Sequence, residues 1–144
     1  MRDQFPVTVH IFFLREESIL LLRRLNTGYE DGNYSVVSGH VERGETVTQA
    51  AIREASEEVG VTIQPQNFNV IGIMHRKSND ERIDFFLTNT IWSGELTNRE
   101  PNKCDELTWF SVNSLPANTI PYIRCALENY QKHQQSMWFE EFGW

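Results

Sequence analysis

One short segment restricts the fold and chemistry of this chain more than any other. From Gly39 to Val61 the chain reads GHVERGETVTQAAIREASEEVGV. Its charged residues include Glu45, Arg53, Glu54, Glu57 and Glu58. The segment predicts a turn followed by a helix that carries several carboxylates.

The ends of this helix can be predicted from local signals. Gly44 permits a tight turn, and Thr46 and Gln49 have the spacing of a capping box. Gly60 stands where a left-handed C-terminal cap belongs. We therefore expect a helix that starts at Thr46 and runs through Val59.

The helix places its carboxylates on one side. Glu54, Glu57 and Glu58 occupy positions i, i+3 and i+4, so they share a face. An acidic helix face is usually just solvated, but Glu54 and Glu58 project within the apolar arc formed by Val47, Ala50, Ala51 and Ala55. Like charges at an apolar edge are costly unless a cation compensates them. The pattern therefore predicts a site for Mg²⁺ or Mn²⁺, which prefer hard oxygen ligands.

Arg53 precedes Glu57 by four residues, a spacing that brings the two side chains together on a helix. We interpret Arg53 as a clamp that partly offsets the carboxylate repulsion and orients these groups. The ordinary alternative is an ion pair on the helix surface.

Length and composition indicate one domain that covers residues 1–144. The 144 residues are 40% hydrophobic, enough for a substantial core, and no linker or repeat divides them. The beginning of the chain does not resemble a signal peptide, and the apolar runs are too short to span a bilayer, so we expect a cytoplasmic protein. The net charge of −7 argues against binding a nucleic-acid polymer through its backbone. Cys104 and Cys125 have no metal-ligand spacing, and we expect both to be reduced thiols.

The remaining chain alternates between apolar strands and polar turns, with a second helix near its end. This order predicts a mixed β-sheet with helices packed on its faces. The predicted strands are Val7 to Leu14, Ser18 to Leu22, Tyr34 to Val37, Phe68 to Arg76, Ile83 to Trp92 and Leu107 to Val112, and the second helix is Ile120 to His133.

The segment from Gly39 to Val61 matches, at every position, the box that defines Nudix (MutT-like) hydrolases: a glycine, five residues, a glutamate, seven residues, then Arg53-Glu54 and Glu57-Glu58 before Gly60. A chance match is expected about once in 10⁸ windows. Sequences on both sides also resemble this family. One departure is Ser38-Gly39-His40, where many MutT-like enzymes have Pro-Gly-Gly.

The resemblance implies the Nudix fold, an α/β/α sandwich with a mixed sheet. It also implies hydrolysis of a diphosphate linkage by water, with a divalent metal bound by the helix carboxylates. By position, the metal ligands are Glu54, Glu57, Glu58 and the carbonyl of Gly39, and Glu45 has a structural role.

The general base is not determined by the resemblance, because in MutT-like enzymes it is either a glutamate of a late loop or a helix glutamate. Among Glu100, Asp105 and Glu106 we favour Glu106, which lies just before the strand that carries Trp109. The predicted catalytic residues are thus Glu57, Glu106 and Arg53.

Four residues are candidates for substrate contacts. Arg23 and Arg24 end the second strand, where they are available to a phosphate or a base, although strand-end arginines are usually only solvated. Tyr34 is a stacking candidate or a core residue. His40 follows the box glycine and is a candidate for contact with a phosphate. His10 is expected to pack inside the first strand.

The C-terminal tail, Met137 to Trp144, is too aromatic for a comfortable solvated end. We expect it either to fold back over the domain or to bury in a partner subunit, and the second case would make the protein a homodimer.

The predicted function is metal-dependent hydrolysis of a small nucleotide, with a nucleoside triphosphate, normal or damaged, converted to monophosphate and pyrophosphate. The alternatives are an ADP-sugar or dinucleoside-polyphosphate hydrolase and a non-catalytic Nudix module that senses a nucleotide. The intact glutamates favour the enzyme.

Overall fold

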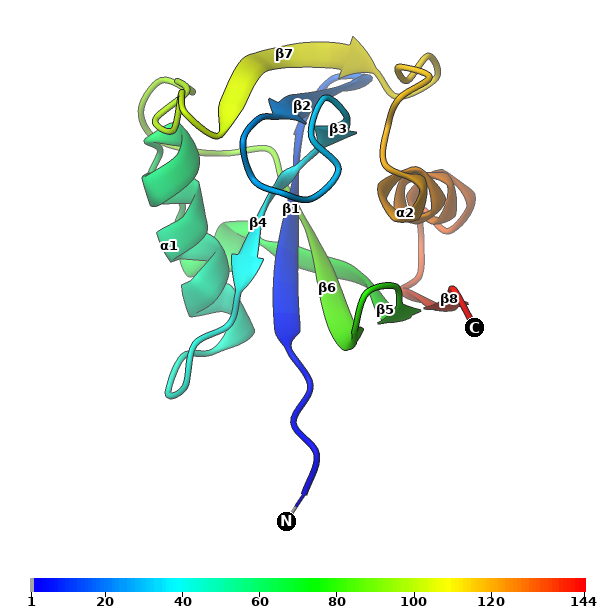
Figure 1. Ribbon diagram of the computed structural model, residues 1–144. Helices are drawn as coiled ribbons and strands as arrows, with labels where there is room; N and C mark the ends of the chain where they lie inside the picture. Colours follow the sequence, from blue (N-terminus) through cyan, green and yellow to red (C-terminus); the bar gives the residue numbers. More distant parts are fainter. Residues whose placement is uncertain (1) are drawn as a thin grey trace.

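The computed structural model describes residues 2–144 and shows an α/β protein with a mixed sheet of eight strands (Figure 1). The chain forms, in order, β1 (Val7–Arg15), β2 (Ser18–Arg24), β3 (Tyr34–Ser35), β4 (Val37–His40), α1 (Val47–Val59), a 3₁₀ turn (Pro65–Asn67), β5 (Asn69–Lys77), β6 (Glu81–Asn89), β7 (Cys104–Ser111), α2 (Pro121–Lys132) and β8 (Trp138–Phe142).

The sheet is built around β1. Its strand order is β3-β2-β1-β6-β5-β8, with β4 also paired to β1 and β7 also paired to β2. β1 runs parallel to β6 and β5 runs parallel to β8, whereas the other pairs are antiparallel. Figure 1 shows α1 and α2 on opposite sides of the central strands. The predicted mixed sheet and α/β/α sandwich are confirmed.

Two apolar cores fill the space between the sheet and the helices. Alternate side chains of β1 serve different cores, because successive residues of a strand point to opposite faces. Val9, Ile11 and Phe13 pack with the alanines of α1, and Phe12 and Leu14 pack in the cluster that includes α2. The alternation fixes the register of the central strand.

The predicted strand from Tyr34 to Val37 divides at Val36 into two strands. Tyr34 and Ser35 pair with β2, whereas the residues from Val37 onward pair with β1. The prediction of one strand was wrong because the chain changes its partner within four residues. The predicted helices are confirmed to within one residue at each end.

The C-terminal tail folds back over its own domain, one of the two expected outcomes. β8 adds a parallel strand beside β5, and Trp138 is 4% exposed. Gly72 in β5 makes this packing possible, since a Cβ there would overlap the Trp138 ring. Within the described residues, no helix is long and apolar enough to cross a membrane.

Candidate active site

Local interactions hold α1 in the position that presents its carboxylates. The backbone N–H of Gln49 donates to Thr46 Oγ1 over 3.1 Å, and the backbone N–H of Thr46 donates to Gln49 Oε1 over 2.9 Å. Gly60 ends the helix in the left-handed conformation, with φ of 72°. The predicted capping box and C-terminal glycine cap are confirmed.

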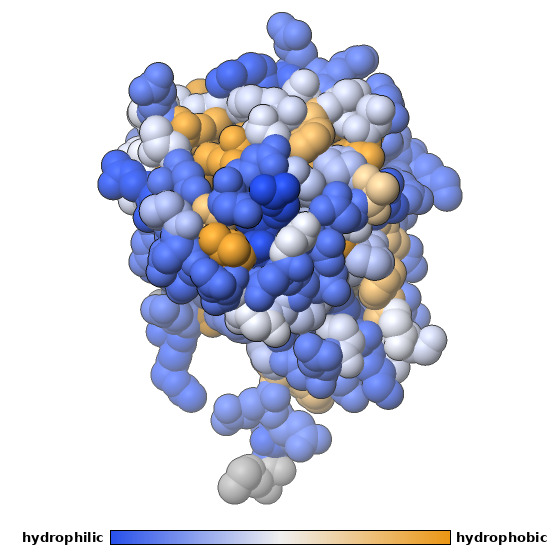
Figure 2. Space-filling model, turned by 45° about the horizontal axis from the view of Figure 1, so that its top comes forward, coloured by the Kyte–Doolittle hydropathy of each residue, from blue (hydrophilic) through white to orange (hydrophobic). Residues whose placement is uncertain are grey.

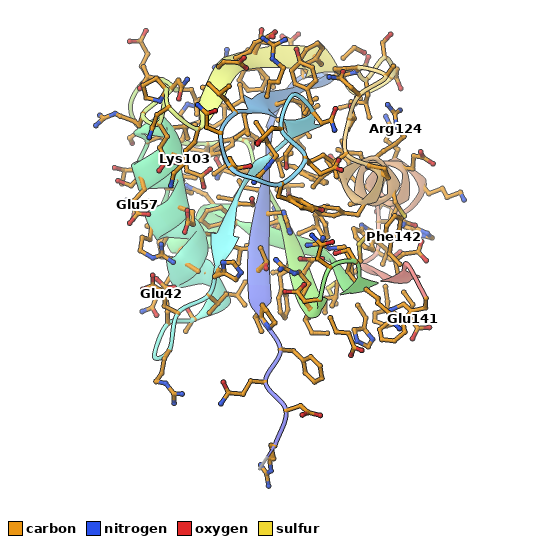
Figure 3. All side chains as sticks on the ribbon, viewed as in Figure 1. Glu42, Glu57, Lys103, Arg124, Glu141 and Phe142 are labelled. Atoms are coloured by element: carbon orange, nitrogen blue, oxygen red, sulfur yellow. The ribbon has the colours of Figure 1, made fainter. Side chains whose placement is uncertain are left out.

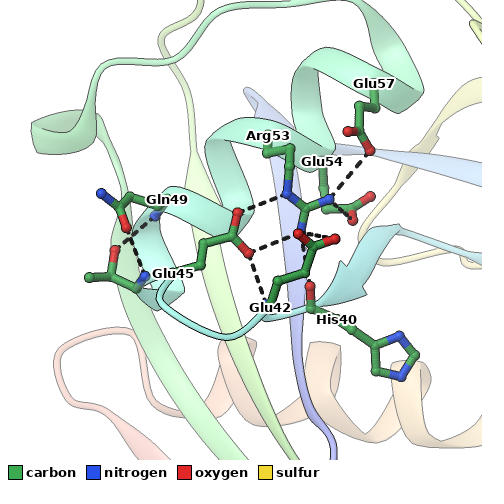
Figure 4. Close-up of polar contacts among 8 residues, drawn as sticks. His40, Glu42, Glu45, Gln49, Arg53, Glu54 and Glu57 are labelled. Atoms are coloured by element: carbon green, nitrogen blue, oxygen red, sulfur yellow. Dashed lines mark hydrogen bonds and ion pairs between the residues drawn. The ribbon is translucent and has the colours of Figure 1, made fainter.

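Arg53 connects the helix to the loop that precedes it (Figure 4). Its Nε donates to Glu45 Oε2 over 2.8 Å, and one Nη donates to the carbonyl oxygen of His40 over 3.0 Å. The other Nη lies 2.7 Å from Glu54 Oε1 and 3.4 Å from Glu57 Oε2. The guanidinium thus orients two of the candidate ligands, as the clamp interpretation requires.

Glu45 is bound into this framework. The guanidinium of Arg53 and the backbone N–H of Glu42 hydrogen-bond its carboxylate and lower its pKa to about 2. The carboxylate therefore stays ionised at neutral pH and has its acceptor positions occupied. This arrangement agrees with the structural role implied for Glu45.

Glu54 and Glu58 form a half-buried carboxylate pair beside β4. The Glu54 side chain is 13% exposed and lies so close to Gly39 that a Cβ at position 39 would overlap it. Glu58 lies within interaction range of Glu54, and its Oε2 atom is buried without a hydrogen-bond partner among residues 2–144. Burial, followed by the neighbouring carboxylates Glu54 and Glu100, raises the pKa of Glu58 well above its ordinary value.

These observations agree with a site for a divalent cation. A buried carboxylate oxygen without a partner, pressed against a second carboxylate, is costly unless a positive charge compensates it. The backbone of Gly39 also lies close to this pair, because a Cβ at position 39 would overlap the end of the Glu54 side chain. Among residues 2–144, no three acidic, His or Cys side chains are already drawn together as a metal site. The donor set fits Mg²⁺ or Mn²⁺ in its chemistry.

The carboxylates line one end of a pocket of about 780 Å³. Figure 3 shows Glu42, Glu57 and Lys103 on the α1 side of the molecule. Figure 2, in which the top of the molecule is turned forward, shows a largely hydrophilic surface. The pocket continues from α1 across β4 and β1 to the first turn of α2. Its lining includes Arg24, Asn26, Thr27, Tyr29, Gly39, His40, Glu42, Arg53, Glu54, Glu57, Glu58, Arg76, Arg82, Asn98, Glu100, Lys103 and Tyr122.

The structure separates the predicted substrate contacts into two groups. Arg24 and His40 line the pocket. Arg23 and Tyr34 do not belong to its lining. Arg23 Nε donates to Asp105 over 2.8 Å, and the Tyr34 hydroxyl donates to Glu106 over 2.7 Å.

The candidate bases are separated in the same way. Glu106 pairs in register with Arg23 across β2 and β7, and its carboxylate accepts the Tyr34 hydroxyl, outside the pocket lining. Glu100 lines the pocket and is close enough to Glu58 to raise the pKa of that residue. The backbone supports this position, because the Arg99 N–H donates to the Glu58 carbonyl over 3.0 Å.

A buried ion pair supports the pocket wall opposite α1. Arg76 Nε donates to Asp84 Oδ2 over 2.6 Å, and His10 Nε2 lies 3.0 Å from Asp84 Oδ1. The Arg76 guanidinium lies over the Tyr122 ring, with its carbon 3.6 Å from the ring centre. Burial lowers the pKa of His10, whereas the contacts of Asp84 with His10 and Arg76 outweigh its burial and lower its pKa to about 2. His10 packs inside the sheet as predicted.

Sequence reasoning did not find the residues of this opposite wall. Tyr29, Arg76 and Tyr122 come from a loop, a strand and a helix that are far apart along the chain. The alternation of side chains along β5 could have indicated that Arg76 is buried. Arg76 shares a strand face with Met74 and Gly72, both of which are buried. A charged residue at a core position predicts either a buried pair or a functional site.

Comparison with known proteins connects this site to a family. A model described as the NUDIX domain matches residues 4–130. The 8-oxo-dGTP diphosphatase of Escherichia coli K12 is 30% identical over 120 residues, which cover 82% of this chain and 88% of that protein. The NAD-capped RNA hydrolase NudC of Pseudomonas aeruginosa is 32% identical over 106 residues, or 74% of this chain, and the chain spans only 36% of that relative's length.

Solved structures agree with the sequence comparison. The crystal structure of a MutT NUDIX hydrolase from Burkholderia pseudomallei superposes with a TM-score of 0.81 at 25% identity, covering 88% of this chain and 98% of that one. With the family model matched over most of its length and the glutamates of α1 gathered beside Gly39, the chain belongs to the Nudix hydrolase family, whose members act on pyrophosphate bonds.

Proposed function

We propose that the protein hydrolyses a diphosphate linkage in a nucleotide with the help of a divalent metal ion. The observation that carries the proposal is the half-buried Glu54–Glu58 pair, in which the Oε2 atom of Glu58 is buried without a hydrogen-bond partner among residues 2–144. If this helix had only a structural role, apolar residues could replace such a pair with little loss of stability. Binding of a cation would explain why two carboxylates occur together at this position.

Glu54, Glu57 and Glu58, together with the Gly39 carbonyl, would hold Mg²⁺ or Mn²⁺. The bound metal supplies charge neutralisation for the phosphates and a more acidic water. Arg53 keeps Glu54 and Glu57 oriented through its 2.7 Å and 3.4 Å contacts. Catalysis of this kind depends on positioning, so the clamp contributes to the rate without touching the substrate.

Glu100 is the general base that the pocket geometry favours over Glu106. Glu100 lines the pocket near Glu58, while Glu106 is held outside the lining by the Tyr34 hydroxyl. A carboxylate can take a proton from an attacking water only from within hydrogen-bonding reach. Glu100→Gln should lower kcat about 100-fold or more, and Glu106→Gln should leave kcat within a factor of about three. The opposite order would restore Glu106 as the base.

Arg24, His40 and Lys103 are the pocket residues available for the anionic part of a substrate. Arg24 and Lys103 form no ion pair with any of residues 2–144, so their charge is free to attract phosphate. Because the protein carries a net charge of −7, such local cations are needed to receive an anion.

The preferred substrate class is a nucleoside triphosphate. One relative that this chain matches over most of both lengths is named an 8-oxo-dGTP diphosphatase. A second candidate class consists of diphosphate-linked nucleotides, because other relatives are named NudC and ADP-ribose pyrophosphatase. The printed name of NudC includes RNA, so a capped RNA end belongs among the test substrates, although the net charge argues against a polymer.

The test is product release from nucleoside triphosphates, ADP-ribose, dinucleoside polyphosphates and NAD-capped RNA, each with Mg²⁺, Mn²⁺ or EDTA. Monophosphate and pyrophosphate from a triphosphate, abolished by EDTA, would support the proposal. Glu57→Gln should remove that turnover while leaving the circular dichroism spectrum unchanged. Nucleotide binding without turnover of any substrate would point instead to a sensing module.

A further inference from the structure

The wall of the pocket opposite α1 carries three hydrogen-bonding side chains to which the proposed hydrolysis gives no role, Tyr29, Arg76 and Tyr122, close to Arg24, which is already assigned to the anionic part of the substrate. Tyr29, Arg24, Arg76 and Tyr122 all line the pocket, and we call them the tyrosine–arginine cluster. They lie across the pocket from the carboxylates of α1, since Tyr122 is in the first turn of α2 (Figure 1).

Several contacts bring the cluster together. The Arg24 guanidinium donates from Nε to the Tyr29 carbonyl over 2.7 Å and lies 5.4 Å from the centre of the Tyr29 ring. Arg76 lies over the Tyr122 ring. Burial raises the pKa of Tyr122 to about 12, and the groups whose charges also act on it are Arg76, Asp84, Tyr29 and Arg24, so the two halves of the cluster are within electrostatic range.

The tyrosine hydroxyls of the cluster do not donate hydrogen bonds to other groups of the described chain. Neither the Tyr29 hydroxyl nor the Tyr122 hydroxyl hydrogen-bonds to another of residues 2–144. Arg24 binds only neutral oxygens, the Tyr29 carbonyl and Thr27 Oγ1, through Nε and one Nη. Its guanidinium forms no direct ion pair with a carboxylate of residues 2–144, although its charge acts on the nearby Asp31, whereas Arg76 is paired directly with Asp84.

The loop that carries Tyr29 is preformed. The Asp31 carboxylate accepts the backbone N–H groups of Thr27 and Gly28 over 3.0 Å and 2.9 Å, and the Thr27 hydroxyl over 2.6 Å. These bonds lower the pKa of Asp31, so the carboxylate stays ionised and keeps the loop closed. A preformed loop loses little entropy when a ligand binds.

The charges along the pocket are separated. All of its carboxylates, at Glu42, Glu54, Glu57, Glu58 and Glu100, lie on α1 or on the segments next to it. The opposite wall offers guanidinium groups and phenolic hydroxyls, including that of Tyr122 in the first turn of α2. Hydroxyl and guanidinium donors in this arrangement match the oxygens of a phosphate group.

We infer that the tyrosine–arginine cluster is a second oxyanion subsite, which binds a phosphate group of the substrate other than those held at the carboxylates. This inference rests on the proposed function, because it assigns the opposite end of the same pocket. The matching substrates carry an additional phosphate, either the terminal phosphate of a nucleoside triphosphate or a phosphate on the ribose of a dinucleotide. The subsite gives these compounds an advantage over analogues that lack the phosphate.

The first experiment titrates the protein with inorganic phosphate in EDTA, so that no metal can hold the anion at the carboxylates. Isothermal calorimetry should detect binding to the wild type, and the double variant Tyr29→Phe and Tyr122→Phe should bind at least about tenfold more weakly. Both replacements keep the aromatic rings. Tyr130→Phe is the matched control, because Tyr130 packs against Phe12 outside the pocket lining, and it should bind phosphate like the wild type.

Absence of phosphate binding, or equal affinity of the wild type and the double variant, would overturn the inference. Equal weakening by Tyr130→Phe would also overturn it, since the loss would then not arise in the cluster. Because this titration needs neither metal nor turnover, its result is independent of the proposed hydrolysis.

The second experiment identifies the source of the phosphate. Values of kcat and KM are compared within two matched pairs, a nucleoside triphosphate with its diphosphate, and NADPH with NADH. The pair that contains the natural type of substrate should respond to the double variant Tyr29→Phe and Tyr122→Phe. In that pair, KM should rise about tenfold for the member with the additional phosphate, and kcat should stay unchanged. A change in kcat alone, or an equal change for both members of each pair, would contradict a binding subsite.

Discussion

Glu58→Gln is expected to stabilise the metal-free protein while it abolishes activity. The wild-type carboxylate is buried against Glu54 and has an oxygen without a partner. Glutamine keeps the size of the side chain, removes the charge and can donate an N–H to Glu54. Removing the carboxylate repulsion and adding this hydrogen bond should raise the free energy of unfolding by about 0.5–2 kcal/mol. With about 2.1 cal/mol/K per residue, the unfolding entropy of 144 residues is about 0.3 kcal/mol/K, which gives an increase in Tm of about 2–7 °C.

The stabilisation should depend on pH in a defined direction. The folded-state pKa of Glu58 is raised, so the native protein binds this proton more tightly than the unfolded chain does. The associated stability is complete below the unfolded pKa of 4.5 and is lost as pH rises through the folded value. Glutamine cannot titrate, and the gain from Glu58→Gln should therefore be larger at pH 8 than at pH 5.

Thermal unfolding in EDTA at several pH values, combined with turnover in Mg²⁺, measures both effects. Turnover should fall more than about 100-fold, because the metal supplies several kcal/mol of charge stabilisation. Glu57→Gln is the control: its side chain is 55% exposed, so it should lose activity without a gain in Tm. Added Mg²⁺ should raise the Tm of the wild type more than that of Glu58→Gln. A lower Tm for Glu58→Gln in EDTA would show that the carboxylate stabilises the fold, and the reasoning would fail.

Two further predictions concern stability. Asp84→Asn should cost about 3–5 kcal/mol, or roughly 10–17 °C in Tm, because it leaves the Arg76 guanidinium buried at 3% exposure without its ion pair. Asp80→Asn, which breaks a pair with 44% exposure of the aspartate, should cost no more than about 1 kcal/mol, and equal losses from both variants would contradict the assignment. Gly72→Ala should cost about 1–3 kcal/mol by displacing the Trp138 ring, and urea denaturation followed by tryptophan fluorescence would reveal an unchanged midpoint if this packing were unimportant.

The parts of the site that sequence could predict are those that depend on local interactions. Thr46, Gln49 and Gly60 determine the ends of α1 through contacts within a few residues. The helical period then places Glu54 and Glu58 on the buried side without knowledge of the partner. For the same reason the contact of Arg53 with Glu57 was accessible from their spacing.

Features that depend on pairing between distant segments could not be predicted in this way. Glu100 and Glu106 are six residues apart in one acidic stretch, and nothing local distinguishes them. The pairing of β2 with β7 places Glu106 opposite Arg23, away from the pocket, while Glu100 lies in the loop next to the end of α1. Strand register is a long-range property, so the choice between these two glutamates needed the structure.

This protein contains two groups of charged side chains that are shielded from water, one around Asp84 and one formed by Glu54 and Glu58. The two groups differ in whether other side chains of the fold compensate the charge. Asp84 accepts hydrogen bonds from Arg76 and lies within hydrogen-bonding distance of His10, so its charge is compensated within the fold. Glu54 and Glu58 act on each other instead, and among residues 2–144 the one cation in contact with the pair is Arg53, which Glu45 shares. Since an uncompensated carboxylate that is shielded from water costs stability, we expect a bound cation to relieve this cost. A cation should therefore stabilise this protein through α1 and leave the Asp84 group unaffected, so Mg²⁺ should raise the Tm of Asp84→Asn by as much as it raises that of the wild type.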